Sequence, residues 1–369
     1  MTTLWGTTWT RSELLRRVGR LDQVAGVRLT TLGDGAGRGV RLLEFRTGIG
    51  FSFDVVIDRT FDVGRCELAG QPLAWIANPG TVGPWYYEND PLGWFRYWGG
   101  GMVVTCGLDH TLIGGEDSAA DFNQPHIRPT QPFALHGRVG GLPARLVGYG
   151  ERWEGDECIL WAEGEVLQSA IFGEHLVLRR RIEARVGESR FTIHDEVENV
   201  GHHRTSHMFL YHCNAGWPIV AGGSELLVPS TATTTDYNVT TKGYATLSEP
   251  MAGFTEACFE HQLVAEPAGT VPVGVVNRTL GLGVYQVFRL EQLPHHTVWR
   301  MMGEDTYALA MEPSTNRDAG RWDARERGEL LFLEGGETRT YDLEIGALSG
   351  GPAIDAFAAR VAGVLARPA

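Results

Sequence analysis

Short apolar stretches, many of them alternating with polar residues, recur along most of the chain and are separated by Gly, Asp and Asn. The pattern is clearest at residues 175–184, where Leu176, Leu178 and Ile182 alternate with charged positions, as in a strand with one buried face. Similar stretches predict strands at residues 27–31, 40–46, 51–56, 145–149, 159–167, 191–199, 204–213, 271–276, 282–288, 306–312 and 338–345. Many short strands joined by turn residues indicate an all-β fold, a large antiparallel β-sandwich.

Helical spacing is confined to the two ends of the chain. Leu14, Val18 and Leu21 predict a short N-terminal helix within residues 9–24, and residues 353–365 predict a C-terminal helix. No internal repeat and no linker composition interrupts the strands between them. We therefore expect a single domain over residues 1–369, with its core at about residues 25–346.

Residues 72–101 follow neither pattern, because this segment is crowded with Gly, Pro and aromatic side chains. Its aromatic residues are Trp75, Trp85, Tyr86, Tyr87, Trp94, Phe95, Tyr97 and Trp98. A long loop inside a compact domain usually has a function. We interpret the segment as an ordered loop whose tryptophans are candidates for packing against a ligand.

The composition excludes several classes of protein. Hydrophobic residues make up 43% and charged residues 21% of the 369 positions, as in a globular protein with a sizeable core. The formal charge of −13 argues against a nucleic-acid partner, which would require a basic face. No apolar run reaches about 18 residues and the N-terminus has no signal-peptide core, so no membrane partner is expected and the cytoplasm is the expected compartment.

Cysteine and lysine usage narrows the chemistry further. The five cysteines are widely spaced without a C-x-x-C pair, which predicts neither a disulfide framework nor a zinc ribbon. Lys242 is the one lysine of the chain, and a Schiff-base mechanism would have to use it. Lys242 lies in a Thr-rich stretch. We expect no cofactor.

His212 is the first candidate for acid–base chemistry. It ends the predicted strand 204–213, next to the corner formed by Asn214, Gly216 and Pro218. An imidazole beside a Gly-rich corner can meet a ligand, while a packed or surface histidine is the alternative. His207 and His212 point to opposite faces of a regular strand, and no H-E-x-x-H spacing occurs, so a metal site is not expected.

Glu312 is the second candidate. Ala308 and Ala310 share its strand face and leave room in front of the carboxylate, and Pro313 directly after it is expected to end regular pairing. A carboxylate at the end of a strand that faces a cleft is a candidate general base. The alternative is a rim carboxylate paired with Arg300 or Arg317.

Two further stretches carry polar side chains. His136 and Arg138 lie in the Gly-rich stretch 133–143, where they can donate hydrogen bonds to a ligand or simply shape a turn. Asp58 and Asp62 are spaced four apart, and they serve either as a glycosidase carboxylate pair or, with better reason, to orient Arg59.

The order of four short motifs resembles the aldose 1-epimerase superfamily. An LHG motif (135–137) is followed by a strand ending in V-x-N (197–199), a Tyr-His pair (211–212) and a late Glu-Pro pair (312–313). The phrases GGGMVVTCGL (99–108), LHGRVGGLPA (135–144), LYHCNAGWP (210–218) and AMEPSTNR (310–317) are similar to one branch of aldose 1-epimerase family proteins. The resemblance covers about residues 25–346. The sequence departs from the usual Tyr-Phe-Asn after the histidine, since Cys213 and Asn214 stand there.

The resemblance implies a galactose mutarotase-like β-sandwich that interconverts the anomers of an aldose. It implies that His212 is the general acid, Glu312 the general base and His136 a substrate-binding histidine, while Glu256, with Asp236 as a rival, replaces the family's sugar-binding Asp. Acid and base would face each other across a sugar-sized hollow. The substrate-binding candidates are His136, Arg138, Asn214, Glu256, Arg59, Trp299 and Asn316.

Two other readings stay open. The same scaffold can carry a different sugar enzyme, such as a lyase, a glycoside-cleaving enzyme or a keto-sugar isomerase, because a His–Glu pair also serves proton abstraction beside a carbonyl. It can also be a sugar-binding protein without turnover. The expected partner is in each case a small sugar. The sequence does not decide the oligomeric state, a homodimer included.

Overall fold

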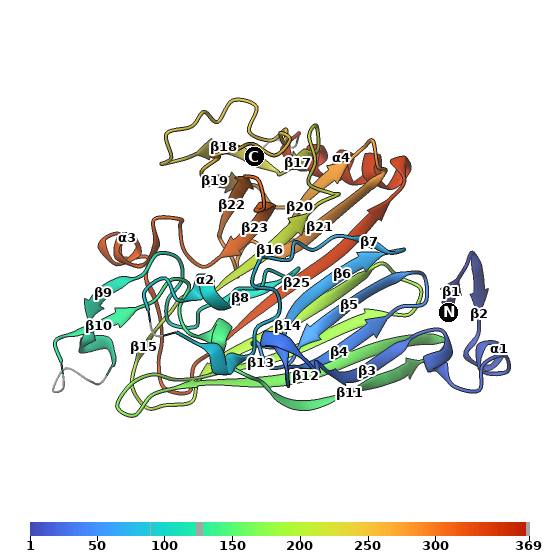
Figure 1. The fold of residues 1–369 in the computed structure, drawn as a ribbon, viewed down its shortest axis with the longest axis horizontal. Coiled ribbons are helices and arrows are strands. Elements are labelled where there is room, and N and C mark those ends of the chain that lie inside the picture. Colours follow the sequence, from blue (N-terminus) through green and yellow to red (C-terminus); the bar gives the residue numbers. More distant parts are fainter. Residues whose placement is uncertain (89, 123–127, 367–369) are drawn as a thin grey trace.

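The computed structural model of the protein describes residues 1–88, 90–122 and 128–366. Antiparallel sheets dominate it (Figure 1). The largest has eight strands in the order β11 (Arg145–Glu154), β12 (Glu157–Ser169), β13 (His175–Arg185), β14 (Arg190–Asn199), β25 (Thr338–Ser349), β21 (Leu282–Arg289), β20 (Thr270–Asn277) and β17 (Glu225–Leu227).

Two smaller sheets accompany it. A sheet of five strands runs in the order β3 (Gly26–Thr31), β4 (Arg41–Arg46), β5 (Phe51–Val56), β6 (Asp62–Leu68) and β7 (Gln71–Pro72). A sheet of six strands runs in the order β18 (Ser230–Thr234), β19 (Ala257–Leu263), β22 (His295–Met302), β23 (Tyr307–Ser314), β16 (Leu210–Gly216) and β8 (Val104–Cys106).

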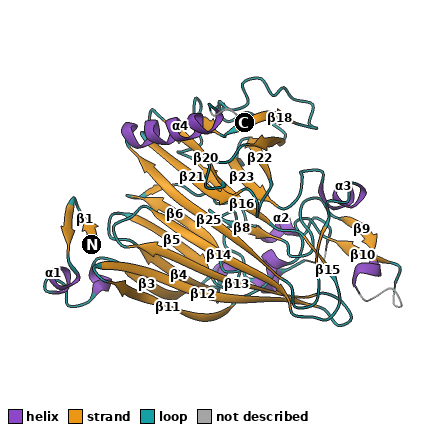
Figure 2. Cartoon of the chain, turned by 180° about the vertical axis from the view of Figure 1, so that it is seen from behind, coloured by secondary structure: helices purple, strands orange, loops and turns teal. Residues whose placement is uncertain are grey.

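Short two-stranded sheets and helices accompany these sheets (Figure 2). The paired strands are β1 (Thr2–Leu4) with β2 (Thr7–Trp9), β9 (Gly115–Ser118) with β10 (Thr130–Phe133), and β15 (Thr205–His207) with β24 (Leu331–Leu333). The α-helices are α1 (Arg11–Leu15), α2 (Trp94–Tyr97), α3 (Gly320–Glu326) and α4 (Gly351–Leu365). The 3₁₀ turns are η1 (Leu21–Gln23), η2 (Gly35–Gly37), η3 (Pro84–Tyr86), η4 (Ala119–Phe122) and η5 (Val139–Gly141).

The core lies between the inner face of the eight-stranded sheet and the two smaller sheets. Phe53 of β5 packs against Phe191 of β14 with ring centroids 4.5 Å apart. Phe209, just before β16, stacks on Tyr341 of β25 at 4.5 Å. Because apolar residues alternate along these strands, each sheet buries one face against the other, which is the expected β-sandwich.

A buried ion network also joins the sheets. Arg180 of β13 is 1% exposed and forms salt bridges with Asp62 of β6 at 2.6 Å and Asp195 of β14 at 2.7 Å. Arg180 also donates to the hydroxyl of Thr105 in β8 at 2.7 Å. The alternation along residues 175–184 thus places an arginine on the buried face, where two carboxylates neutralise it.

The ends of the chain follow the prediction in part. Helix α4 begins two residues before the predicted start and buries Ile354, Phe357 and Val361. The predicted helix at residues 9–24 is instead a strand, the short helix α1 and the turn η1. A capping box of Thr10 and Glu13 starts α1. The helix does not continue to Gly19, because glycine is a poor helix former.

The predicted strand 204–213 is two strands, β15 and β16, which belong to different sheets. His207 and His212 are therefore separated by a sheet boundary as well as by alternation. Neither His212 nor Glu312 ends its strand, since β16 runs on to Gly216 and β23 to Ser314. Pro313 interrupts the ladder locally instead, because proline has no N–H to donate.

Strands β6, β19 and β22 were not predicted from the sequence. The single-domain expectation for residues 1–369 stays a prediction. Among the helices of the described residues, none is both long and apolar enough to cross a bilayer.

Candidate functional site

The register of the six-stranded sheet brings His212 and Glu312 together. Leu210 pairs with Ser314 and Cys213 with Met311, which places His212 of β16 opposite Glu312 of β23 on one face of the sheet. Nε2 of His212 lies 3.3 Å from Oε1 of Glu312. The two candidates from the sequence are thus neighbours in space, a hundred residues apart in the chain. They are in direct contact, however, without the sugar-sized hollow that the resemblance implies.

Asn214 fixes the tautomer of His212. Its side-chain Nδ2 donates to the carbonyl oxygens of Gly101 and His212, both at 2.9 Å, so its Oδ1 must face the imidazole. Nδ1 of His212 lies 2.6 Å from that Oδ1 and therefore carries the hydrogen of this bond. Nε2 is left as the nitrogen that exchanges a proton with Glu312.

Burial shifts the two pKa values in opposite directions. His212 and Glu312 are 3% and 2% exposed. Burial lowers the pKa of His212 to about 4, against the effect of its hydrogen bond to Asn214. Burial, followed by the charges of Asp318 and Glu256, raises the pKa of Glu312 well above its ordinary value. Both shifts favour a neutral pair in this closed arrangement, with the carboxyl group of Glu312 protonated and Nε2 of His212 unprotonated.

Oε1 of Glu312 is buried and forms no hydrogen bond with the described residues, although it contacts the imidazole. A buried polar atom without a hydrogen bond costs stability, so it marks a site that a ligand or a water molecule completes. Within the described part of the chain no group of His, Cys, Asp or Glu side chains has the arrangement of a metal site.

Aromatic rings surround His212. Its ring centroid lies 4.9 Å from Trp98, 5.7 Å from Trp299 and 5.6 Å from His136. Trp94 stacks on Trp98 at 4.1 Å and also contacts His136 at 4.5 Å. Trp94 and Trp98, from the aromatic segment, therefore form an aromatic cover over the dyad.

A groove of about 570 Å³ lies on the far side of this cover. Trp75, Trp98 and Trp299 form its apolar wall, and Glu256 adds a carboxylate at the edge. Trp98 and Trp299 touch His212 with their rings and also line the groove, so they separate the dyad from it. The three indole rings are tilted against one another by 51–66°, and each offers a rigid apolar surface on which the C–H face of a sugar ring can pack.

Glu256 is held in place at the groove. It accepts a hydrogen bond from Nε1 of Trp299 at 2.8 Å and another from the hydroxyl of Tyr237 at 3.4 Å. Its carboxylate is exposed and can accept further hydrogen bonds from hydroxyl groups.

His136 joins the dyad, whereas Arg138 faces another part of the fold. His136 has a positive φ of 58° and is 8% exposed. Burial first, and then the neighbouring His212, lower its pKa well below the ordinary value, so it is a neutral ring. Arg138 contacts the buried Asp109 at 3.5 Å and donates to the carbonyl of Pro132.

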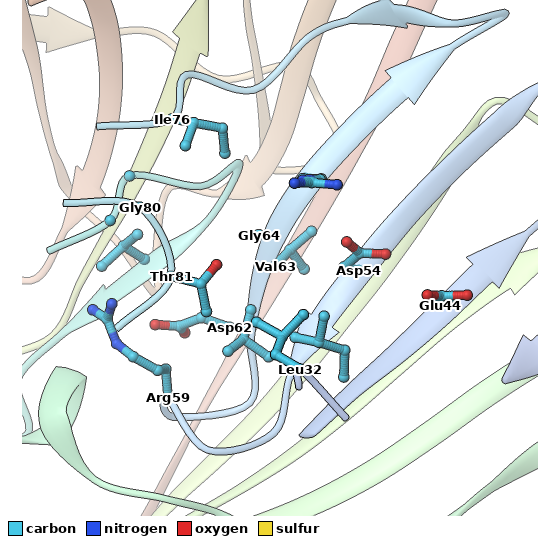
Figure 3. Close-up of a pocket in the computed structure, with 16 residues that line it drawn as sticks. Leu32, Glu44, Asp54, Arg59, Asp62, Val63, Gly64, Ile76, Gly80 and Thr81 are labelled. Atoms are coloured by element: carbon cyan, nitrogen blue, oxygen red, sulfur yellow. The ribbon is translucent and has the colours of Figure 1, made fainter. Parts of the chain in front are cut away.

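Asn316 and Arg59 also lie apart from the dyad. Asn316 accepts from the hydroxyl of Thr111 at 2.9 Å and donates to the carbonyl of Arg317, contacts that shape the chain after β23. Arg59 lines a different cavity, between the five-stranded sheet and residues 76–100 (Figure 3).

Trp98 and Asp318 are parts of the site that the sequence did not single out. The density of aromatic residues in 72–101 pointed to the cover as a whole but not to Trp98. Asp318 lies close enough to Glu312 to raise its pKa, and burial raises the pKa of Asp318 itself to about 6. Only the fold brings Asp318 there, so no sequence signal was available for it.

The sheets have the arrangement of a galactose mutarotase-like β-sandwich, and the dyad lies on the fourth and fifth strands of the six-stranded sheet. A protein of Klebsiella pneumoniae subsp. pneumoniae provisionally described as an aldose 1-epimerase matches with a TM-score of 0.83 and 22% identity over 94% of this chain and 90% of that one. The galactose 1-epimerase of Lactobacillus acidophilus matches with a TM-score of 0.53 and 10% identity over 88% of this chain and 99% of that one. A galactose mutarotase-like protein of Clostridium acetobutylicum matches with a TM-score of 0.57 and 9% identity over 88% and 98%. At these identities the likeness concerns the fold.

The chain belongs to the family described as "Domain of unknown function (DUF4432)", whose model matches residues 37–347. No curated protein matches it.

Proposed function

We propose that the protein is a carbohydrate-active isomerase that interconverts the anomers of an aldose, with His212 and Glu312 as its acid–base pair. The observation that carries the proposal is the contact of 3.3 Å between Nε2 and Oε1 at a site enclosed by tryptophans. Anomer exchange requires one group that removes the proton of the C1 hydroxyl and another that protonates the ring oxygen. The similarity to proteins described as aldose 1-epimerases supports this class of reaction.

The proposed mechanism uses the one proton that the His212–Glu312 pair carries. One member of the pair takes the proton of the C1 hydroxyl while the other gives its proton to the ring oxygen, and the ring opens. Rotation about the C1–C2 bond and closure on the other face reverse the two roles. Glu312 as base and His212 as acid is the assignment that the family resemblance implies. Burial favours the proton on Glu312 in the closed pair, so this assignment requires that sugar binding reverses the order of the two pKa values.

The proposal requires the site to open. A sugar ring has to enter between two groups that now touch, and Trp98 and Trp299 lie between these groups and the groove. The sugar is expected to bind first in the groove, against the tryptophans and Glu256, and to reach the dyad as the cover moves. Asn214 keeps Nε2 directed at Glu312 during this step, because its own amide is anchored on two carbonyl oxygens.

The test is anomer exchange measured by NMR on a panel of aldoses, with Glu312→Gln and His212→Asn as the variants. Each is expected to lower the exchange rate by about 10²–10⁴-fold, the usual contribution of a positioned acid or base. Glu260→Gln is the matched control, because Glu260 lies two strands away from Glu312, on β19 of the same sheet, and is paired with Arg317 at 3.0 Å. Unchanged exchange in both dyad variants would rule out the mechanism.

A sugar-binding protein without turnover is the second candidate, and the closure of the dyad is the observation that favours it. It predicts saturable binding of a sugar together with no anomer exchange by the unmodified chain. The same NMR samples separate the two, since line shapes report binding and exchange peaks report turnover. Deuterium incorporation at carbon would point instead to a keto-sugar isomerase or a lyase.

A further inference from the structure

A second cavity lies on the outer face of the five-stranded sheet, beneath residues 76–100 (Figure 3). Its volume is about 220 Å³, the space of roughly seven water molecules at about 30 Å³ each. Much of its wall is aliphatic, from Leu32, Leu42, Val56, Val63, Ile76 and Val104. The opposite wall is backbone, because Gly80 and Gly99 approach so closely that a Cβ on Gly99 would lie 2.0 Å from the carbonyl oxygen of Gly80.

The distinctive feature of this cavity is the guanidinium of Arg59. It is 7% exposed, and its Nε and Nη1 donate to the backbone carbonyls of Gly140 and Tyr97. Within the described part of the chain no carboxylate lies within 4.0 Å of it, and its Nη2 has no hydrogen-bond partner. A buried cation without an ionic partner is costly, so an anion supplied from outside would stabilise it.

The carboxylates around the cavity already have partners or stand apart from Arg59. Asp62 forms its salt bridge with Arg180 at 2.6 Å, an arginine that it shares with Asp195, and Glu44 is paired with Arg28. At the other end of the cavity, Asp54 interacts electrostatically with the exposed Arg65. Figure 3 shows Arg59 and Asp54 at opposite ends of the cavity. Among the described residues no carboxylate contacts Arg59 itself, so its Nη2 is left as a donor for a small monoanion.

We propose that this cavity is a binding site for a small aliphatic monocarboxylate, whose carboxylate is held by Arg59 and whose apolar body packs on Leu42, Val56 and Val104. A carboxylate fits the planar edge of a guanidinium with two parallel hydrogen bonds. The aliphatic wall favours a short branched or linear chain over a sugar, which would leave its hydroxyl groups without partners. The site is separate from the His212–Glu312 dyad and does not depend on the function proposed for it.

The cavity shares structure with the cover of the dyad. Gly99 and Gly100 line it and directly follow Trp98, which packs on His212. Val104 lines it and pairs in the β8–β16 ladder with His212. A bound carboxylate would rest against the base of the aromatic cover, so its presence is expected to change the fluorescence of the tryptophans there.

The test is a ligand-observed NMR titration of the full chain with 3-methylbutanoate, compared with its neutral amide, D-glucuronate and inorganic phosphate. The acid is expected to bind and the amide to bind at least about tenfold more weakly, the effect of a charge-assisted hydrogen bond. Arg59→Gln should weaken the acid by a similar factor. Thr81→Trp is the second variant, because Thr81 is an exposed lining residue whose enlargement fills the cavity without disturbing the core.

Glu312→Gln is the control and is expected to bind 3-methylbutanoate unchanged. Equal binding of the acid and its amide would overturn the proposal, and so would full binding by both Arg59→Gln and Thr81→Trp. Preferential binding of phosphate or D-glucuronate would overturn the assigned class of ligand. Loss of binding in Glu312→Gln alone would show that 3-methylbutanoate binds at the dyad and would overturn the proposed site. Anomer exchange by the same samples reports separately on the proposed function.

Discussion

Replacing Arg180 by Met is expected to be among the most damaging single changes to this fold. The guanidinium bridges Asp62 and Asp195 with side-chain contacts of 2.6 and 2.7 Å, and all three groups are buried. Methionine fills much of the same volume but leaves two carboxylates buried without a counter-ion. Breaking a buried pair in this way costs about 3–5 kcal/mol. That is a large part of the roughly 5–15 kcal/mol by which proteins are stable.

The sign of the pH effect follows from the orphaned carboxylates. Burial already raises the pKa of Asp62, against the charge of Arg180 and the hydrogen bonds of Thr105 that lower it. Without Arg180, the pKa of Asp62 is higher in the folded chain than in the unfolded chain, so the folded chain binds this proton at a higher pH. Stability then falls as the pH rises through that raised pKa. The loss caused by Arg180→Met should accordingly be largest at pH 8 and smaller at pH 5.

Urea unfolding followed by tryptophan fluorescence measures the effect, with Arg181→Met as the control. Arg181 is the next residue of β13, but it points outward, is half-buried and pairs with Glu163 and Glu183, so its loss should cost about 1 kcal/mol or less. The triple variant D62N/R180M/D195N should recover most of the stability, because it removes the uncompensated charges. Equal losses in the two arginine variants, or a loss independent of pH, would refute the reasoning.

Three further predictions concern the site and its surroundings. Asn214→Leu removes the hydrogen bond that fixes the tautomer of His212. It should lower the rate of anomer exchange, measured by NMR, about tenfold or more with little change in KM. A change confined to KM would contradict this role. Burial lowers the pKa of His207 to about 4, whereas the hydrogen bond and charge of Asp342 raise the pKa of His194 against the effect of burial. In an NMR titration His194 should therefore gain its proton before His207 as the pH falls. The reverse order would contradict this prediction. Gly99→Ala should lower the thermal midpoint, with a cost of about 2 kcal/mol, because its Cβ would meet the carbonyl of Gly80 at 2.0 Å; an unchanged midpoint would show that residues 76–100 yield easily.

Strands of the eight-stranded and five-stranded sheets were predictable where their side chains alternate. Residues 51–56 form β5 as predicted, and β13 and β14 cover the predicted stretches with a difference of one residue at an end. Strand β22 was missed since its sequence, HHTVWRMM, carries polar residues on a face that the site buries. The prediction assumes that polar residues face water, so it missed a strand whose polar residues are buried in the site.

The sequence identified His212 and Glu312 as a pair, but it did not indicate that the two side chains touch and are covered. Residue type and family order identified the two side chains. The contact between them depends on the register of β16 against β23, and their exclusion from water depends on Trp98 and Trp299, which come from distant segments. Arg180 shows the same limit, because alternation assigned it to a buried face without indicating the two carboxylates that make burial tolerable.

The contrast between the dyad and its cover suggests how a closed site can still act on a sugar. His212 and Glu312 lie on neighbouring central strands, whereas Trp98 comes from a segment with only short helical turns. Exposing an indole of about 150–250 Å² to water would cost roughly 4–6 kcal/mol at about 25 cal/mol per Å². A sugar ring that packs its C–H face on the moving tryptophan offsets much of this cost, while water does not. Under the proposed function the substrate itself therefore favours opening, and the dyad stays sealed from water when no sugar is bound.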